Sequence, residues 1–159
     1  NTKADYLSHC LDSDDWCINE HIFRQIDFMW GPHSVDRFAT NYNNRCVRFN
    51  SKWWVPGTEA VNCFNECWSL ENNWLVPPPN LISRCIQKMK HDKGSYTLVV
   101  PKWQSASFWP LLNLIHILFI WKGLDNRQYA YISPLLIRSE HTFIQTYIQT
   151  KLTRMIILC

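Results

Sequence analysis

The segment that decides the fold has the sequence ENNWLVPPPN and occupies residues 71–80. Its centre, residues 74–76, is a short apolar run of the kind found in buried strands. The next three residues are Pro77, Pro78 and Pro79. Proline cannot donate to a sheet but suits the first turn of a helix. We therefore expect a strand that ends at the prolines and leads into a helix beginning near Asn80.

Strands and helices alternate on both sides of this segment. Residues 34–39 and 96–100 have the composition of strands, and apolar residues recur at helical spacing within 17–29, 58–69 and 81–89. Such alternation is typical of βαβ units. The sequence predicts an α/β, Rossmann-like fold with a mainly parallel sheet and helices on both faces.

Three unusual segments follow the predicted strands. Asp36 lies near the end of the first strand, the prolines follow the second, and Pro101, Lys102 and Trp103 follow the third. In open parallel sheets, ligands bind beyond the C-terminal ends of the strands. We expect these segments to share one rim of the sheet.

Composition excludes some classes of function. The chain has 159 residues, 47% of them hydrophobic, which is enough for one domain of ordinary size. Its net charge of +3 allows contact with nucleic acid but does not indicate it. The four glycines are dispersed, so neither a P-loop nor a dinucleotide-binding motif is present.

The cysteine pattern favours a reducing compartment. Seven cysteines stand at irregular spacing and no signal peptide is recognised, so we expect an intracellular protein, cytoplasmic or nuclear, with buried free thiols. No set of four zinc ligands has suitable spacing, and we expect no metal site. The nearest approximations are Cys10, Cys17 and His21, and the pair Cys63 and Cys67.

The longest apolar run, residues 108–121, falls short of the roughly 20 residues that span a bilayer. We expect it to form a buried helix and expect no membrane partner. From residue 113 onward the chain is rich in Leu and Ile and poor in acids. Residues 113–159 are therefore a tail for which two origins stay open: further elements of the fold, or sequence altered by a frameshift or intron read-through.

Tryptophans directly follow a lysine at two places in the chain. Trp53 and Trp54 follow Lys52, and Trp103 follows Lys102. Stacking aromatic rings next to cations are typical of proteins that bind single strands. Tryptophan more often fills a core or its margin. Both interpretations are kept, with the second favoured.

The first eight residues, NTKADYLS, resemble the last motif of retroelement RNase H domains, Asn-x-x-Ala-Asp-x-Leu-Ser. The resemblance makes Asp5 the final metal-binding carboxylate of that enzyme. One acid cannot hold two metal ions, so we expect no RNase H activity here. Residues 16–112 are similar to the segment that follows RNase H in DIRS-like retrotransposons, which carry a tyrosine recombinase.

The resemblance implies three regions. Residues 1–12 would be the end of an RNase H domain, residues 16–112 a domain of its own, and residues 113–159 the tail. Because the first residue is Asn1, we expect a piece of a longer translation product. Its partners would be neighbouring polyprotein domains and the DNA or RNA of the parent element.

The middle region in turn resembles phage-type adenine-specific DNA methyltransferases. That family implies a Rossmann-like fold that binds S-adenosylmethionine and methylates a flipped-out adenine at an Asp/Asn-Pro-Pro-Tyr/Phe motif. The order and spacing of short segments carry the resemblance. They are VDRFA at 35–39, NNRCVRF at 43–49, VPPP at 76–79, LVVP at 98–101 and FW at 108–109.

Two residues of the first segment are implied as contacts of the cofactor. The resemblance makes Asp36, with Phe38, a part of the S-adenosylmethionine site. The alternative is that Asp36 caps a helix or pairs with Arg37, Arg45 or Arg48. The two interpretations stand about even.

The catalytic motif is degenerate. The family's acid or amide accepts hydrogen bonds from the adenine amino group, and its aromatic ring stacks on the base. Val76 replaces the first and Pro79 the second. Single positioned groups are worth about a hundredfold in rate, so we expect no methyl transfer and no cofactor. Asn72, Asn73 or Asn80 could supply an amide from a neighbouring position, although strand geometry disfavours the first two.

Three functions follow from these observations. The leading hypothesis is a retrotransposon polyprotein fragment whose inactive methyltransferase-like domain has a structural or nucleic-acid-associated role. The alternatives are an active adenine methyltransferase that uses S-adenosylmethionine, and an unrelated α/β module that binds a protein through its aromatic surface.

Overall fold

A computed structural model describes residues 17–112, 119–123, 131–133 and 153–158 of the chain. The predicted end of an RNase H domain, residues 1–12 with Asp5, lies outside the described residues. Most of the tail also lies outside them.

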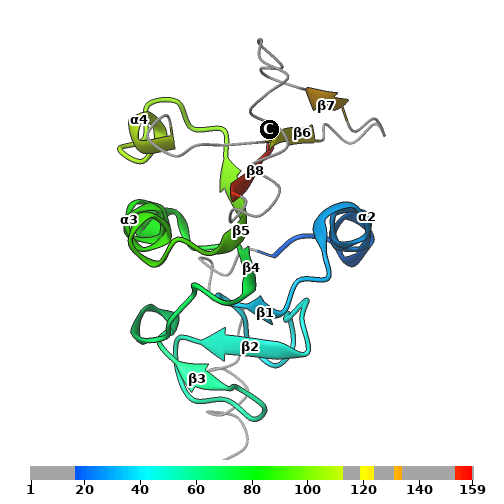
Figure 1. Ribbon diagram of the computed structural model, residues 1–159, viewed down its shortest axis with the longest axis vertical. Helices are drawn as coiled ribbons and strands as arrows, with labels where there is room; N and C mark the ends of the chain where they lie inside the picture. The colour runs from blue at the N-terminus through cyan, green and yellow to red at the C-terminus, as the bar shows by residue number, and fades with distance from the viewer. Residues whose placement is uncertain (1–16, 113–118, 124–130, 134–152, 159) are drawn as a thin grey trace, which may run out of the picture.

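The described strands form one sheet with the order β3-β2-β1-β4-β5-β8-β6-β7 (Figure 1). Neighbouring strands are parallel except for β6 and β7, which are antiparallel. The prediction of a mainly parallel sheet is confirmed. The strands are β1 Val35–Asp36, β2 Arg48–Ser51, β3 Ala60–Val61, β4 Asn72–Leu75, β5 Ser95–Pro101, β6 Phe119–Gly123, β7 Tyr131–Ser133 and β8 Thr153–Leu158.

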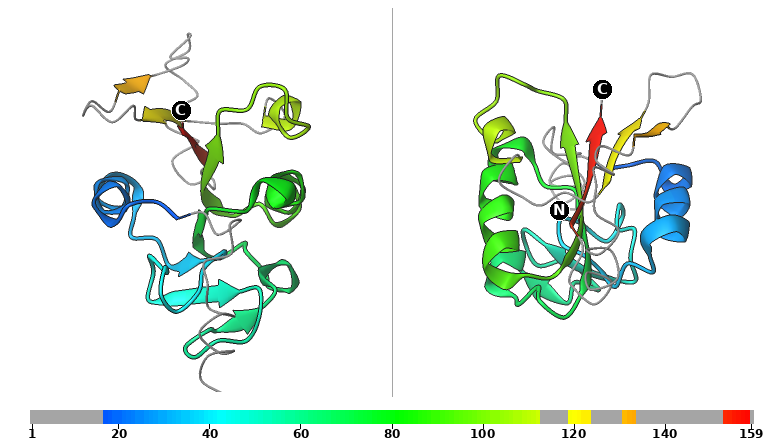
Figure 2. Two further views of the ribbon diagram at one scale, coloured as in Figure 1. Left: turned by 180° about the vertical axis from the view of Figure 1, so that it is seen from behind. Right: turned by 45° about the horizontal axis from the view of Figure 1, so that its top comes forward.

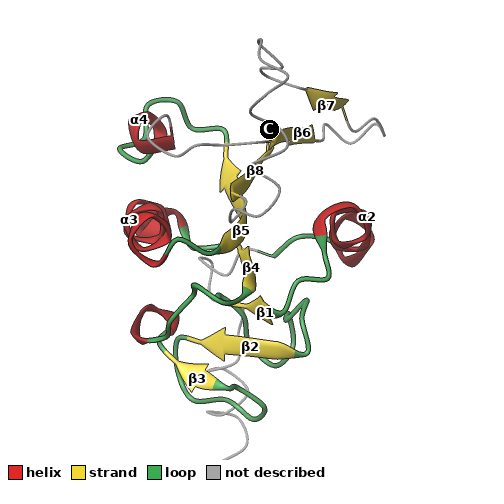
Figure 3. Ribbon diagram, in the orientation of Figure 1, coloured by secondary structure: helices red, strands yellow, loops and turns green. Residues whose placement is uncertain are grey.

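Helices cover both faces of the sheet, as the sequence predicts (Figure 2). Helix α2, Glu20–Trp30, lies on one face, and α3, Ile82–Asp92, lies on the other with the short α4, Trp109–Leu112. Two 3-10 turns, η1 at Cys63–Asn65 and η2 at Pro79–Leu81, lie on the α3 side (Figure 3). The sheet is thus the middle of three layers.

Each face of the sheet has its own hydrophobic core, because successive side chains on a strand point to opposite faces. Trp74 and Val99 pack with Phe23 and Ile26 of α2. Their neighbours Leu75 and Leu98 pack on the other face, in a cluster that also holds Trp68, Ile82, Cys85, Ile86 and Met89. Strands β4 and β5 therefore carry apolar side chains on both faces.

Helix α2 begins at Asn19, whose side chain accepts a 2.8 Å hydrogen bond from the backbone N–H of His21. An Asn cap satisfies one of the free N–H groups of the first turn.

A buried imidazole connects α2 to the middle of the sheet. His33 Nδ1 lies 2.6 Å from Asp27 Oδ1, and His33 Nε2 lies 2.8 Å from Thr97 Oγ1 of β5. The His33 backbone N–H also donates to Asp27. The His33 side chain is fully buried. These bonds fix the path of the chain from the end of α2 into β1.

The helix predicted for residues 58–69 is wrong. This segment forms the edge strand β3, then the turn η1, then an irregular connection to β4. Asn62 has the left-handed value φ 61°, which interrupts a helix, and its side chain accepts from the N–H of Phe64. The apolar residues at helical spacing are still buried at Cys63 and Trp68. An irregular segment that buries these residues therefore shows the same spacing of apolar residues as a helix.

Two other expectations need correction. The apolar run 108–121 does not form one helix, because α4 ends at Leu112 and residues 119–123 pair with β8 as strand β6. The sequence also gave no strand at β2, whose residues Arg48–Ser51 are mostly polar but are buried from Phe49 onward. Pairing on both sides, with β1 and β3, stabilises β2 despite its composition.

The end of α3 offers a matched pair of substitutions. Lys93, next to Gly94, is the residue with left-handed backbone there, at φ 52°. A Cβ on Gly94 would lie 2.4 Å from the carbonyl oxygen of Trp68. We expect Gly94→Ala to lower the free energy of unfolding by about 1–3 kcal/mol through this backbone clash. Lys93→Gly should raise it by up to about 1 kcal/mol, because glycine adopts this conformation without strain.

Urea denaturation of both variants and the unchanged chain measures these effects. Equal stability of Gly94→Ala and the unchanged chain would contradict the close approach of Trp68.

Candidate functional site

A cleft of about 530 Å³ lies where β1, β2 and β4 end. Loops that follow these three strands line it, through residues 37–40, 51–53 and several positions of 76–81. Residues 61–64 and Arg84 of α3 complete the wall. The cleft thus occupies the place where parallel α/β sheets bind ligands, and its volume is that of small-molecule sites.

The cleft brings together five of the residues that the sequence predicted as site residues. They are Phe38, Lys52, Trp53, Val76 and Pro78. Other predicted site residues do not line it, namely Asp36, Pro77, Pro79, Lys102 and Trp103. Of the three segments predicted to share a rim, the cleft therefore includes part of the proline segment, whereas Asp36 and the segment after β5 do not contribute to it.

The proline segment acts as the connection between β4 and α3. The carbonyl of Pro78 accepts a 2.9 Å hydrogen bond from the N–H of Leu81, and Pro79 begins the turn η2. Val76 is buried and packs in the core beneath α2 as well as lining the cleft. This matches the expected rigid exit from a strand into a helix.

Asn72 and Asn73 do not point amides into the cleft. Asn73 is fully buried, and its Nδ2 donates to the carbonyls of Trp68, Glu71 and Ser95. The amide Nδ2 of Asn72 donates to the carbonyls of Trp30, the last residue of α2, and of Pro32. Asn80, the third amide considered from the sequence, does line the cleft.

Asp36 lies on the opposite side of β1 from the cleft. Its carboxylate accepts from the backbone N–H of Arg45 at 3.0 Å and of Phe38 at 3.3 Å. It lines a separate small cavity beside Cys17 and Trp74, beneath α2. Burial raises the pKa of Asp36 to about 6, and the two backbone hydrogen bonds oppose this rise. These contacts favour the structural interpretation, in which Asp36 holds the loop after β1.

Arg37 is a charged residue of the cleft that sequence reasoning missed. Only 4% of it is exposed. Its Nε donates to Asn73 Oδ1 at 2.8 Å and its Nη1 to Asn50 Oδ1 at 2.8 Å, while Nη2 donates to the carbonyl of Cys67 at 3.3 Å. Burial lowers the pKa of Arg37. Strand alternation was the available signal, since it places Arg37 on the face opposite Asp36.

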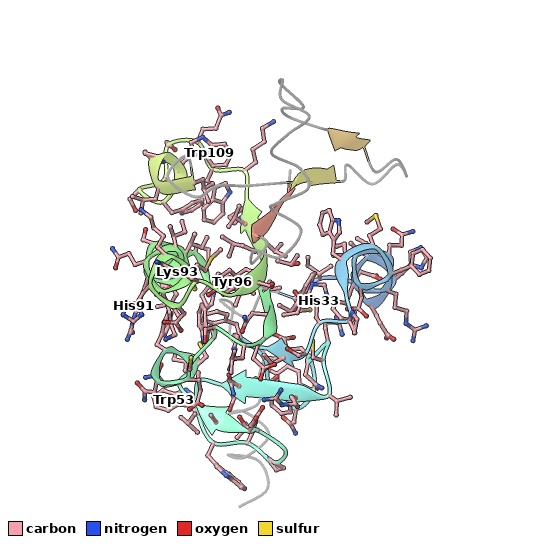
Figure 4. The ribbon with its side chains drawn as sticks, in the orientation of Figure 1. His33, Trp53, His91, Lys93, Tyr96 and Trp109 are labelled. Atoms are coloured by element: carbon pink, nitrogen blue, oxygen red, sulfur yellow. The ribbon has the colours of Figure 1, made fainter. Side chains whose placement is uncertain are left out.

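The cleft combines cations with aromatic rings. The Arg84 guanidinium lies 4.0 Å from the centroid of the Phe64 ring, and Lys52 Nζ lies 5.5 Å from that of Trp53. Trp53 is 71% exposed and lies beyond the end of β2 (Figure 4). Within the described part of the chain, three basic residues line the cleft and no carboxylate does. The site therefore favours anionic ligands that carry a flat ring.

The exposed tryptophans correct a prediction. The sequence favoured Trp53, Trp54 and Trp103 as core residues, but all three are classed as exposed. Trp68 and Trp74 fill the two cores instead. The sequence separates the two groups poorly because both kinds of tryptophan stand next to polar residues.

The described cysteines differ in burial. Cys46, Cys63 and Cys85 are buried, as predicted, whereas Cys17 and Cys67 are exposed, which the sequence did not predict. Burial raises the pKa of Cys63 to about 12, so its thiol is protonated at neutral pH. Among the described residues, no group of three His, Cys, Asp or Glu side chains is placed to hold a metal ion.

Comparison with known proteins gives no match. No protein-family model fits the chain, and no curated protein or solved structure is significantly similar to it. The helices within the described ranges are too short or too polar to cross a bilayer.

Asp36 should make the stability of the protein depend on pH. Its ordinary pKa is 3.8, and burial raises it to about 6 in the folded chain. Between these values the folded state holds the proton more tightly, so this group lowers the free energy of unfolding as pH rises from about 4 to about 6. The loss amounts to about 3 kcal/mol. Asp36→Asn cannot titrate and should lack this component.

Urea denaturation of both proteins at several pH values between about 4 and 7 measures the difference in unfolding free energy. Curves that run parallel across this range would show that Asp36 is not a buried acid.

Proposed function

We propose that this chain is part of a DIRS-like retrotransposon polyprotein, in which a methyltransferase-like α/β domain no longer transfers methyl groups and binds nucleic acid through its cleft. The observation that carries the proposal is the lining of the cleft. Arg37, Lys52 and Arg84 supply positive charge there, beside the exposed ring of Trp53.

These groups match the chemistry of a nucleic-acid strand. Phosphates are attracted to lysine and arginine, and every base has a flat face that stacks on an aromatic ring. Trp53 is exposed at the mouth of the cleft, whereas Arg37 is buried. A base on Trp53 and a phosphate near the basic residues would use both features at once.

The same lining argues against methyl transfer. S-adenosylmethionine carries a positive sulfonium, a positive amino group and one carboxylate, so its net charge is positive and favours acidic or neutral surroundings. The cleft presents basic residues, and the predicted cofactor acid Asp36 lies on the other side of β1. Val76 offers no side-chain acceptor to an adenine amino group. The residues present do not fit the cofactor, so we propose that the domain does without it.

Binding of a single-stranded DNA oligonucleotide by fluorescence anisotropy tests the nucleic-acid function. We expect Trp53→Ala to weaken binding by about 5- to 150-fold through loss of stacking. Arg84→Gln should reduce the slope of log affinity against log salt by about one, because one phosphate contact is lost.

Lys90→Gln is the matched control for Arg84→Gln. Lys90 is an exposed residue of the same helix α3 but does not line the cleft. It should leave the affinity and the salt slope nearly unchanged. If Lys90→Gln and Arg84→Gln weaken binding equally, the cleft is not the site.

Calorimetric titration with S-adenosylmethionine tests the loss of the cofactor. We expect no heat of binding, because the cations of the ligand would meet the cations of the cleft. Micromolar binding, together with methyl transfer to DNA that Asp36→Ala abolishes, would restore the active-enzyme hypothesis.

A further inference from the structure

The guanidinium of Arg37 is a buried cation whose hydrogen-bond partners in the described part of the chain are all neutral. Two amide oxygens and one backbone carbonyl accept its three hydrogen bonds. The carboxylates of Glu59 and Glu71, which stabilise its charge from a distance, are hydrogen-bonded to Arg48 instead. A buried charge ordinarily has an opposite charge in contact with it. Among the residues that the structure describes, no carboxylate is in direct contact with Arg37 to balance its buried charge.

The donors of Arg37 are also incompletely used. A guanidinium has five N–H groups, and the three hydrogen bonds employ one on each of its nitrogens. One N–H on Nη1 and one on Nη2 have no role in these bonds. Two such donors on a planar fork match the oxygens of a phosphate. Because Arg37 lines the cleft, an anion inside the cleft would approach this fork.

Burial decides which kind of phosphate can reach Arg37. An internal phosphodiester of a strand is attached on both sides, so the chain must enter and leave the cleft around it. A terminal phosphate is attached on one side only and can extend to the end of a cleft. It also carries about −1.5 to −2 charge at neutral pH, against −1 for a phosphodiester. A cation that is 4% exposed thus favours the strand end over the middle of the strand.

On the basis of the nucleic-acid function proposed above, we propose that the cleft receives the phosphorylated end of a single strand, with the terminal phosphate on Arg37. The first base stacks on Trp53, which is exposed beside Lys52. Arg84, over the Phe64 ring, contacts the phosphate of the next linkage. The domain would then distinguish phosphorylated strand ends from unphosphorylated ones.

Competition binding with the unchanged chain tests this directly. Short oligothymidylates with a 5′-phosphate, with a 3′-phosphate and with neither are compared as competitors of a fluorescent strand. We expect one of the phosphorylated ends to compete about tenfold or more better than the unmodified strand, since hydrogen bonds to charged groups are worth about 1.5–3 kcal/mol. Inorganic phosphate alone should compete far more weakly, because it lacks the base.

Two variants locate the effect. Arg37→Lys keeps the charge but loses the fork, and it should abolish the advantage of the phosphorylated end while binding of the unmodified strand persists. Circular dichroism shows whether this variant is folded. The comparison of ligands on the unchanged chain does not depend on that outcome. Lys90→Gln, which changes a cation outside the cleft, should keep the full advantage.

The outcomes separate the two proposals. Equal binding of all three strands overturns the preference for an end and leaves the nucleic-acid function standing. No binding of any strand overturns both. Competition by inorganic phosphate at the same concentration as the phosphorylated strand would show a simple phosphate site and would also overturn the preference.

Discussion

The buried amide of Asn73 is the interaction on which the site depends. It lies on β4 and binds the carbonyl of Trp68 before that strand and the carbonyl of Ser95 on β5. Its oxygen accepts from Arg37 after β1. One side chain thus connects strands β4 and β5 to the loop that carries Arg37. A buried polar group of this kind stabilises only if all its partners are present, which ties the position of Arg37 to the register of the sheet.

The sequence predicted the central strands and the helices that cover them better than the strands at the β3 end of the sheet. Strand β5 and helix α3 have regular apolar patterns, and both lie where the pattern places them. The edge strand β3 and its neighbour β2 have no such pattern, because β2 is held by pairing on both sides and by buried polar residues such as Asn50. Trp68 is buried in an irregular connection, and its spacing from other apolar residues led to the wrong prediction of a helix. Tertiary contacts that a single sequence does not show account for each of these differences.

The site was partly predictable for a related reason. Positions at strand ends are found from sequence, so Val76 and Pro78 were expected at a binding rim, whereas Phe38 was singled out by the family resemblance and Lys52 by its place beside Trp53. The face on which a side chain points also follows from the strand, and this rule separates Asp36 from Arg37 across β1. Arg84 could not be predicted, because its role depends on where η1 brings Phe64. The cleft therefore lies where parallel α/β sheets bind ligands, and its basic lining favours an anionic ligand.

Strand β8 has a consequence for the order of assembly. It pairs with β5 on one side and β6 on the other, although residues 153–158 follow both of these strands in the chain. During synthesis, β5 and β6 are made before β8, the strand that pairs with both of them. Until β8 is made, the edges of β5 and β6 that will face it have unpaired backbone groups. Open strand edges invite pairing with other chains. Strand β8 therefore completes the sheet between β5 and β6. A nascent chain is most exposed to incorrect strand pairing just before β8 is made.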